Sequence, residues 1–412
     1  MLNFLHKKAI ASAISAPPGL GAVVLLFGTL ASPCALADIS DTIKPFAAAS
    51  YSYDDNLMRL PDVVAGFDGP RSDTSRLLQA GFLFNRPIGR QILTGQAKWS
   101  KVSFNRFNQF DYDGKDFLAD LEWHVGNHLE GHAGASYSQT LTPFSDFQSN
   151  VRNLRTERRE YLDGAWRFHP SWRVRSGITR ERYSYDLPAQ AFSNWSEDAT
   201  ELGLDYLAPS GSRIGLQLRH LDGSYPNRLG DASAVYGNGY RQDEAKANIY
   251  WELSGITQIE FLGGWVRHRN KMLAGRDSSG SNGRLSVYWQ PLGKVRFTGM
   301  VWREFGSVDN SLVTSSLNTG ASLGSVWTIS AKVRAEAQLR RVRRDFSAVS
   351  GLTLPGDGRD TTSTASLGLT YAPHPKVQLG ARVFHERRTG ASIIDSGNYR
   401  AKGVSFNGSV QF

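Results

Sequence analysis

Cysteine is almost absent from this 412-residue sequence, and long apolar runs are confined to its beginning. The only cysteine is Cys34, so the chain cannot form an internal disulfide framework. After residue 37 no stretch approaches the 18 or more consecutive apolar residues that a membrane-spanning helix needs. These two absences exclude a disulfide-stabilised domain and a helical membrane protein.

A concentrated block of charge of one sign is also missing. The formal net charge is +9, and the basic residues are spread along the whole chain. Because no cluster of lysine and arginine falls on a helix-like face, nucleic acid is not expected as a partner. If residues 1–37 are removed, Lys7 and Lys8 are lost with no acids, and the net charge becomes 9 − 2 = +7.

The N-terminus has the pattern of a secretory signal. Lys7 and Lys8 precede the apolar run GAVVLLFGTLA, and the small-residue sequence ALA ends at Ala37. This order predicts a signal peptide over residues 1–37 and an exported domain over residues 38–412. Lipidation at Cys34 is the alternative, but Pro33 stands where a lipoprotein signal needs a small residue other than proline.

The remaining sequence alternates between apolar and polar residues in segments of ten to fifteen, which is typical of β-strands. VRFTGMVWREF, Val295–Phe305, is one example. Eight tight turns alternate with nine longer connections, which gives about eighteen strands, with a range of 16–18. We therefore expect an all-β, transmembrane antiparallel β-barrel in the outer membrane of a Gram-negative bacterium, with short periplasmic turns and longer extracellular loops. A single barrel domain without a plug is expected.

Two hairpins predict which face is apolar. Around Gly126–His128, Val125 would lie opposite Leu129 outside, and His124 opposite Glu130 inside. A hairpin centred on Leu292 would place Trp289 opposite Val295 and Tyr288 opposite Arg296. Both registers put apolar side chains outside, as in a membrane barrel. Aromatic residues near the short turns predict a girdle on the apolar face: Trp123, Phe168, Trp172, Tyr206, Trp251, Trp289, Trp327 and Tyr371.

The predicted inner face is rich in arginine. One interpretation is a solvated lumen whose charges pair across strands; the other is a basic track for an anionic or hydroxyl-rich polymer, with Tyr250 and Tyr288 as flat surfaces for sugar rings. Arg167 is predicted to lie opposite Arg173, a destabilising pair of like charges unless an anion lies between them. The track consists of Arg167, Arg173, Arg175, Arg213, Arg219, Arg284, Arg296, Arg334, Arg340 and Arg382.

Metal binding and catalysis are weakly indicated. HVGNHLEGH would bring Glu122, His124, Glu130 and His132 to one face, and zinc accepts such ligands. The spacing belongs to an alternating hairpin, however, and a His–Glu ladder explains it equally well, so no metal and no cofactor are expected. No G-x-S-x-G or comparable signature accompanies the serines and histidines, so no enzyme activity is expected.

The segment DTIKPFAAASYSYDDNLMRLPD resembles the start of the EpsL-type outer-membrane proteins encoded with exosortase-B exopolysaccharide systems. The matching residues are Asp54, Asp55, Asn56, Leu57, Arg59 and Leu60. The resemblance implies a role in exopolysaccharide export or assembly, with polysaccharide as cargo and periplasmic and inner-membrane export proteins as partners. The acids lack the order of a calcium loop, so turn formation is the preferred reading of their chemistry.

The sequence therefore predicts a non-enzymatic conduit or accessory for an extracellular polysaccharide. The alternatives are a general or sugar-selective diffusion porin, which an inward-folding loop with opposed acids and bases would favour, an outer-membrane enzyme, and a structural or adhesive surface protein. Outer-membrane lipids and lipopolysaccharide are expected to surround the barrel. The C-terminal Phe412 resembles the signal that barrel-assembly machinery reads.

Overall fold

The structure is a computed structural model in which the chain forms one closed antiparallel β-barrel. It describes residues 42–61, 69–228, 237–307, 313–348, 358–390 and 397–412. Within them, each strand pairs with its neighbours in chain order and β1 pairs with β18, which closes an 18-stranded sheet. The predicted fold class and strand number are confirmed. The predicted signal peptide, residues 1–37, lies outside the described residues.

The strands are 12 to 16 residues long, enough to cross a bilayer at a tilt. Their bounds are β1 Ile43–Asp54, β2 Asp73–Ile88, β3 Gln91–Phe104, β4 Tyr112–Val125, β5 Leu129–Leu141, β6 Leu154–His169, β7 Trp172–Tyr185, β8 Trp195–Leu207, β9 Arg213–Ser224, β10 Gly239–Ser254, β11 Thr257–Asn270, β12 Ser278–Leu292, β13 Val295–Ser307, β14 Val313–Thr328, β15 Val333–Ala348, β16 Arg359–His374, β17 Val377–Gly390 and β18 Tyr399–Gln411.

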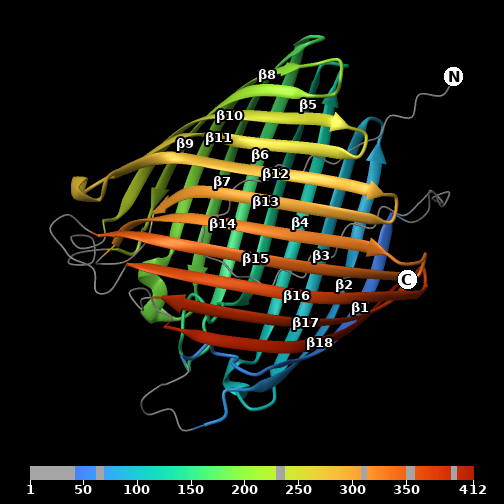
Figure 1. The fold of residues 1–412 in the computed structure, drawn as a ribbon, viewed down its shortest axis with the longest axis vertical. Helices are drawn as coiled ribbons and strands as arrows, with labels where there is room; N and C mark the ends of the chain where they lie inside the picture. The colour runs from blue at the N-terminus through green and yellow to red at the C-terminus, as the bar shows by residue number, and fades with distance from the viewer. Residues whose placement is uncertain (1–41, 62–68, 229–236, 308–312, 349–357, 391–396) are drawn as a thin grey trace.

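Short and long connections gather at opposite ends of the barrel. In Figure 1 the short turns lie toward the upper right, with the C-terminus, and the longer loops lie toward the lower left. Three single 3-10 turns, η1 (Asn108–Phe110), η2 (Pro188–Ser193) and η3 (Ala274–Arg276), lie in the longer loops. None of the described helices has the length and apolar character needed to cross a membrane.

The apolar face points outward, as the alternation predicts. Of the eight aromatic residues expected in a girdle near the short turns, seven are exposed on the outer wall, and Trp166 is exposed beside them. Trp123 is half-buried because its ring lies over the side-chain-free positions of Gly131 and Gly164. An outer wall of exposed leucine, isoleucine, valine and tryptophan is stable only against lipid, so the fold is that of a transmembrane barrel.

The first predicted hairpin is confirmed, and the second is wrong by two residues. Val125 lies opposite Leu129 and His124 opposite Glu130, and Gly126 supplies the positive φ of 59° that the turn needs. At the second hairpin Trp289 lies opposite Phe297 and Tyr288 opposite Thr298. The register shifts between Trp289 and Leu292, where Pro291 has no N–H to donate to the ladder.

Arg167 and Arg173, which the sequence predicts to lie opposite each other, fall at an irregularity in their hairpin. The turn contains two residues, Pro170 and Ser171, so that His169 lies opposite Trp172 and a register shift interrupts the pairing between Trp166 and His169. Arg167 falls within this interruption. On the neighbouring strand β8, Asp205 lies opposite Arg173. Asp205 therefore supplies a negative charge beside Arg173, whose source the sequence alone did not identify.

Candidate functional site: the long-loop mouth and the lumen

The segment that carries the family resemblance folds into a compact turn at the long-loop end of β1. Asn56 is buried; its backbone N–H donates to Asp54 Oδ1 at 2.9 Å, and its side-chain oxygen accepts from the Leu60 N–H at 2.9 Å. The Asn56 amide donates to the carbonyls of Leu60 and Arg400, each at 2.8 Å. The turn is therefore held both by its own backbone and by β18, which confirms turn formation as the chemistry of these residues.

Two further residues of this segment attach it to the barrel. The Lys402 N–H donates to Asp55 Oδ1 at 2.7 Å. Arg59 adopts the left-handed backbone conformation, with φ of 56°, and its guanidinium pairs with Asp54 at 2.8 Å and Glu386 at 3.6 Å. Glu386 belongs to β17, so the segment joins β1, β17 and β18. Leu57 and Leu60 contribute backbone bonds, the Leu57 N–H donating to Arg71 O.

The loop between β5 and β6, residues 142–153, reaches across the mouth. Its Gln148 side-chain amide donates to the carbonyl of Arg59 in the β1–β2 connection. Its Asp146 lies close enough to Arg344 on β15 and Arg388 on β17 for their charges to act on its carboxyl. Because β17 lies six strands from β5 around the sheet, this loop spans the opening and narrows it.

Asp146 sits in an environment that favours its neutral form. Burial raises the pKa of the Asp146 carboxyl to about 6. A hydrogen bond from the Ser145 hydroxyl, at 3.0 Å, and the neighbouring arginines act in the opposite direction without cancelling the effect of burial. The same arginines bond to Asp360, each with a guanidinium nitrogen at 2.6 Å. The mouth thus contains the opposed acids and bases expected of a porin constriction.

Residues of neighbouring loops pack against residues 142–153, which we call the crossing loop. Phe144 packs on Phe110 of η1 with ring centroids 4.9 Å apart, and Phe110 is fully buried. Arg152 Nη1 donates to the carbonyl of Asp111 at 3.1 Å. On the other side, the Leu154 N–H donates to Asp186. The loop is therefore packed against its neighbours as well as tied at its tip.

Five of the ten arginines of the predicted lumen track are neutralised within the wall. Arg173 and Arg175 both bond to Asp205 Oδ2, with closest distances of 2.8 Å, and the Asp205 side chain has no exposed surface. Arg175 also pairs with Glu201 at 3.2 Å. Arg284 pairs with Glu304 on β13 at 2.6 Å. The structure favours the interpretation in which lumen charges pair across strands.

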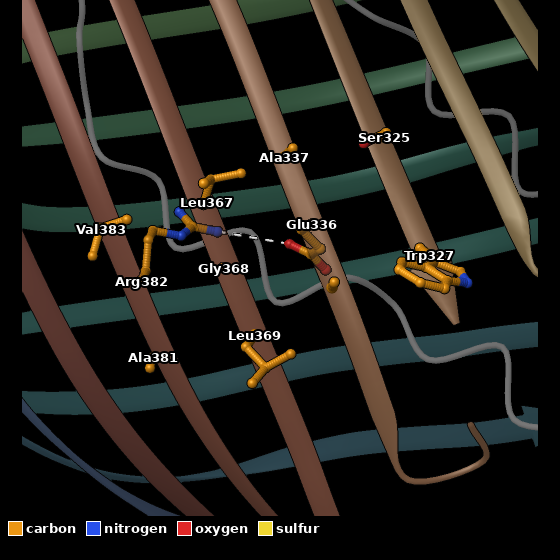
Figure 2. Close-up of a pocket in the computed structure, with 11 residues that line it drawn as sticks. Ser325, Trp327, Glu336, Ala337, Leu367, Gly368, Leu369, Ala381, Arg382 and Val383 are labelled. Atoms are coloured by element: carbon orange, nitrogen blue, oxygen red, sulfur yellow. Dashed lines mark ion pairs between the residues drawn. The ribbon is translucent and has the colours of Figure 1, made fainter. Parts of the chain in front are cut away.

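One pair spans a complete strand. Glu336 on β15 and Arg382 on β17 lie on either side of Gly368 on β16, and their charged groups approach to 3.7 Å (Figure 2). Gly368 has no side chain to stand between them. Arg334 pairs with Glu336 as well, at 3.0 Å. This acid therefore holds two of the predicted track residues.

Four track arginines have no carboxylate within ion-pairing distance in the described part of the chain. Arg296 reaches only the Gln290 side-chain oxygen, at 3.5 Å, and Arg340 lies over the ring of Trp302 at 5.1 Å. Arg213 has a buried Nε without a partner, and Arg167 is exposed. Arg219 lies opposite Glu201 and Glu244. These four guanidinium groups are therefore not neutralised by an ion pair within the wall.

Several tyrosine hydroxyls donate hydrogen bonds to carboxylates of the lumen, which the sequence did not predict. Tyr288, a predicted lumen aromatic, donates from its hydroxyl to Glu260 at 3.2 Å, and Tyr250 lies opposite the same glutamate on the neighbouring strand. Tyr161, Tyr240 and Tyr399 donate to acids on other strands. Only the cross-strand register brings these partners together, and sequence spacing carries no signal of it.

The histidine segment forms a ladder. His124 Nε2 lies 3.5 Å from Glu122 and 4.0 Å from Glu130, and His132 lies 3.5 Å from Asp163. Across the described residues no group of three or more His, Cys, Asp or Glu side chains is arranged to hold a metal ion. His220 pairs with Asp243 at 2.7 Å and His268 approaches Gln242 at 3.3 Å.

No protein-family model and no curated protein matches the chain, so the EpsL-type resemblance stays a prediction. Among solved structures, OccAB3 of Acinetobacter baumannii shares 11% identity and a TM-score of 0.48, covering 90% of this chain and 99% of that one. Two Pseudomonas aeruginosa proteins, OpdK with vanillate and OccK2 (OpdF) with glucuronate, each share 11% identity and a TM-score of 0.49. They cover 90% of this chain and 99% and 98% of theirs. At such low identity we draw nothing about solutes or partners from them.

Proposed function

We propose that this protein is a passive, non-enzymatic outer-membrane channel for small hydrophilic solutes. A closed barrel of eighteen strands is wide enough to enclose water. Its apolar outer wall fits a bilayer, and its inner wall carries charges and hydroxyls that a solute can contact in passing. These features support diffusion through the lumen, with the long loops at the cell surface and the short turns in the periplasm.

The observation that carries the proposal is the crossing of the mouth by residues 142–153. Gln148 ties this loop to Arg59, and Asp146 lies close enough to Arg344 and Arg388 for their charges to act on its carboxyl. A constriction made of an acid opposite several bases sorts small solutes by size and charge. A polymer conduit would gain from a wide mouth, so the crossing loop supports the porin alternative over the exopolysaccharide conduit.

We further propose a mild preference for anions. Arg167, Arg213, Arg296 and Arg340 have no carboxylate partner among the described residues and come from strands on several sides of the lumen. Such dispersed charges orient an anion weakly and release it readily, which transport requires. Hydroxyl-rich solutes could use the same arginines and Tyr288.

Planar-bilayer recording tests the channel proposal. Purified protein should produce stepwise ionic conductance, and the reversal potential in a KCl gradient should show modest anion preference. Replacing Arg213, Arg296 and Arg340 together by glutamine should move that preference toward cations. The double variant K98Q/D116N is the control, because it removes an ion pair with a separation of 3.2 Å and leaves the net charge of the lumen unchanged. A correctly folded protein that never conducts would overturn the proposal.

Exopolysaccharide export is the competing function, and its support is the resemblance of residues 54–60. Deleting the gene and measuring surface and periplasmic polysaccharide separates the two. Unchanged surface polymer is expected for a diffusion channel. Accumulation of polymer in the periplasm would favour export, with polysaccharide as cargo and inner-membrane export proteins as partners.

A further inference from the structure

A row of basic side chains crosses the outer wall of β15 to β18 at the long-loop edge of the apolar band. Arg341 lies opposite Ser363, Ser363 opposite Arg387, and Arg387 opposite Arg400. One step closer to the short turns, Leu339 lies opposite Ala365 and Ala365 opposite His385. The basic row therefore marks the boundary where the outer wall changes from apolar to charged.

These side chains point outward. Arg341 alternates in phase with Leu339, and Arg387 alternates in phase with Val383, and both apolar residues are exposed on the outer wall. Arg341 and Arg387 are exposed themselves. The row thus faces the membrane boundary and has no access to the lumen.

The row has an unusual charge balance. Within the described residues no carboxylate lies within ion-pairing distance of Arg341 or Arg387. On the far wall, by contrast, Arg180 and Arg182 each have an acidic partner.

Two far-wall pairs define this contrast. Arg180 lies 2.5 Å from Asp198, and Arg182 lies 3.8 Å from Glu160. Asp198 of β8 and Glu160 of β6 therefore neutralise Arg180 and Arg182. On β15 to β18, Arg341 and Arg387 are left for a partner outside the chain.

An apolar groove of about 570 Å³ opens directly below the row. Its floor is low because Gly299, Ala321 and Ala365 are small, and Leu323 and Leu339 rise beside it. Arg341 and His385 line its long-loop end. The groove therefore has an apolar part along its length and basic side chains at its long-loop end.

We propose that this wall binds a phosphorylated lipid of the outer leaflet. Its phosphate would lie between Arg341 and Arg387, where guanidinium groups can form paired hydrogen bonds to phosphate oxygens. One acyl chain would occupy the groove over Ala321 and Ala365. The inference rests on the proposed outer-membrane location but not on conduction of solutes.

Native mass spectrometry of the detergent-purified protein tests the site with two probes: lipid A carrying two phosphates, and the same lipid after enzymatic removal of both. Wild-type protein should bind the phosphorylated probe at least about tenfold more tightly. The double variant R341Q/R387Q should bind it roughly ten- to thirtyfold more weakly. The double variant R180Q/R182Q, which removes two outward charges from the far wall, should bind like the wild type.

A second variant tests the groove without altering charge. Ala365→Trp should fill the hollow and weaken binding, and heat-modifiable migration on gels verifies that each variant is folded. Equal affinity for both probes, undiminished binding by R341Q/R387Q, or equal losses in the two double variants would overturn the proposal. R341Q/R387Q should retain wild-type conductance, because neither side chain faces the lumen; absent conductance with intact lipid binding would instead count against the channel alone.

Discussion

The Gln148 side-chain amide donates a hydrogen bond to the Arg59 carbonyl, and this contact joins the β5–β6 loop to the β1–β2 connection at the barrel mouth. Gln148 belongs to the β5–β6 loop, and Arg59 follows β1. Arg59 is itself fixed by Asp54 and Glu386. The crossing loop is therefore anchored to a rigid point, and its position controls how wide the channel opens.

Removing this anchor should enlarge the channel. In Gln148→Ala, loss of one hydrogen bond of about 1 kcal/mol should shift the docking equilibrium of the loop roughly fivefold toward the undocked state. Single-channel recording should show longer or larger openings. Gln190→Ala, in the neighbouring β7–β8 loop, is the control and should leave the traces unchanged. Identical openings in both variants would mean that the contact does not hold the loop.

The conductance should depend on pH through Asp146. Its pKa is raised to about 6 in the docked loop, from a usual value of 3.8, so the docked loop holds the proton more tightly. Docking is therefore strongest below about pH 4, weakens as the pH rises from about 4 to about 6, and changes little above that. Open probability measured between pH 4 and pH 7 should increase across this window.

Asp146→Asn provides the control for that dependence. The amide cannot ionise, so the variant should keep the low open probability of acid conditions at pH 7 as well. A variant that still opens with rising pH would assign the effect to another group.

Breaking the Asp205 cluster should destabilise the whole barrel. In Asp205→Asn, Arg173 and Arg175 lose their shared buried carboxylate, and removing one partner of a buried ion pair costs about 3–5 kcal/mol. Urea unfolding followed by tryptophan fluorescence should show this as a lower midpoint. Arg382→Gln removes the longer, partly exposed contact to Glu336 and should cost no more than about 1 kcal/mol. Similar losses for both variants would contradict the assignment.

Replacing Asn56 should loosen the mouth without unfolding the barrel. Asn56→Ala removes side-chain hydrogen bonds to Leu60 and Arg400 and leaves buried backbone groups unpaired, at about 1–3 kcal/mol. Hydrogen exchange at residues 56–61 and at the start of β18 should accelerate. Exchange in β6 and β7, on another part of the sheet, should stay as in the wild type. Unchanged exchange at both places would exclude a structural role for this side chain.

The sequence predicts the barrel well because its signal is local. Alternation places Leu339 and Arg340 on opposite faces whatever the strand pairs with, and the turn at Gly126 sets its own register. The predicted register of the hairpin at Leu292 was wrong because Pro291 interrupts the hydrogen-bond ladder between β12 and β13. That effect depends on which hydrogen bonds the partner strand requires.

The candidate site was predicted only in part because it is assembled from distant segments. The arginines of the lumen were found by alternation, but their partners, such as Asp205 for Arg173, depend on pairing between strands. The crossing loop was predicted only as one of nine longer connections, and nothing in its local sequence distinguishes it from the others. Its contact with Arg59 joins residues 89 positions apart.

The attachment of residues 55 and 56 to β18 has a consequence for assembly. Asp55 bonds to Lys402 and Asn56 to Arg400, across separations of 347 and 344 residues. These bonds cannot form until the last strand has arrived beside the first, and contacts between such distant residues form late in folding. Residues 55 and 56 lie at the end of the first strand, yet their hydrogen bonds to β18 form only when the barrel closes. These bonds therefore stabilise the closed barrel and no earlier stage of its assembly.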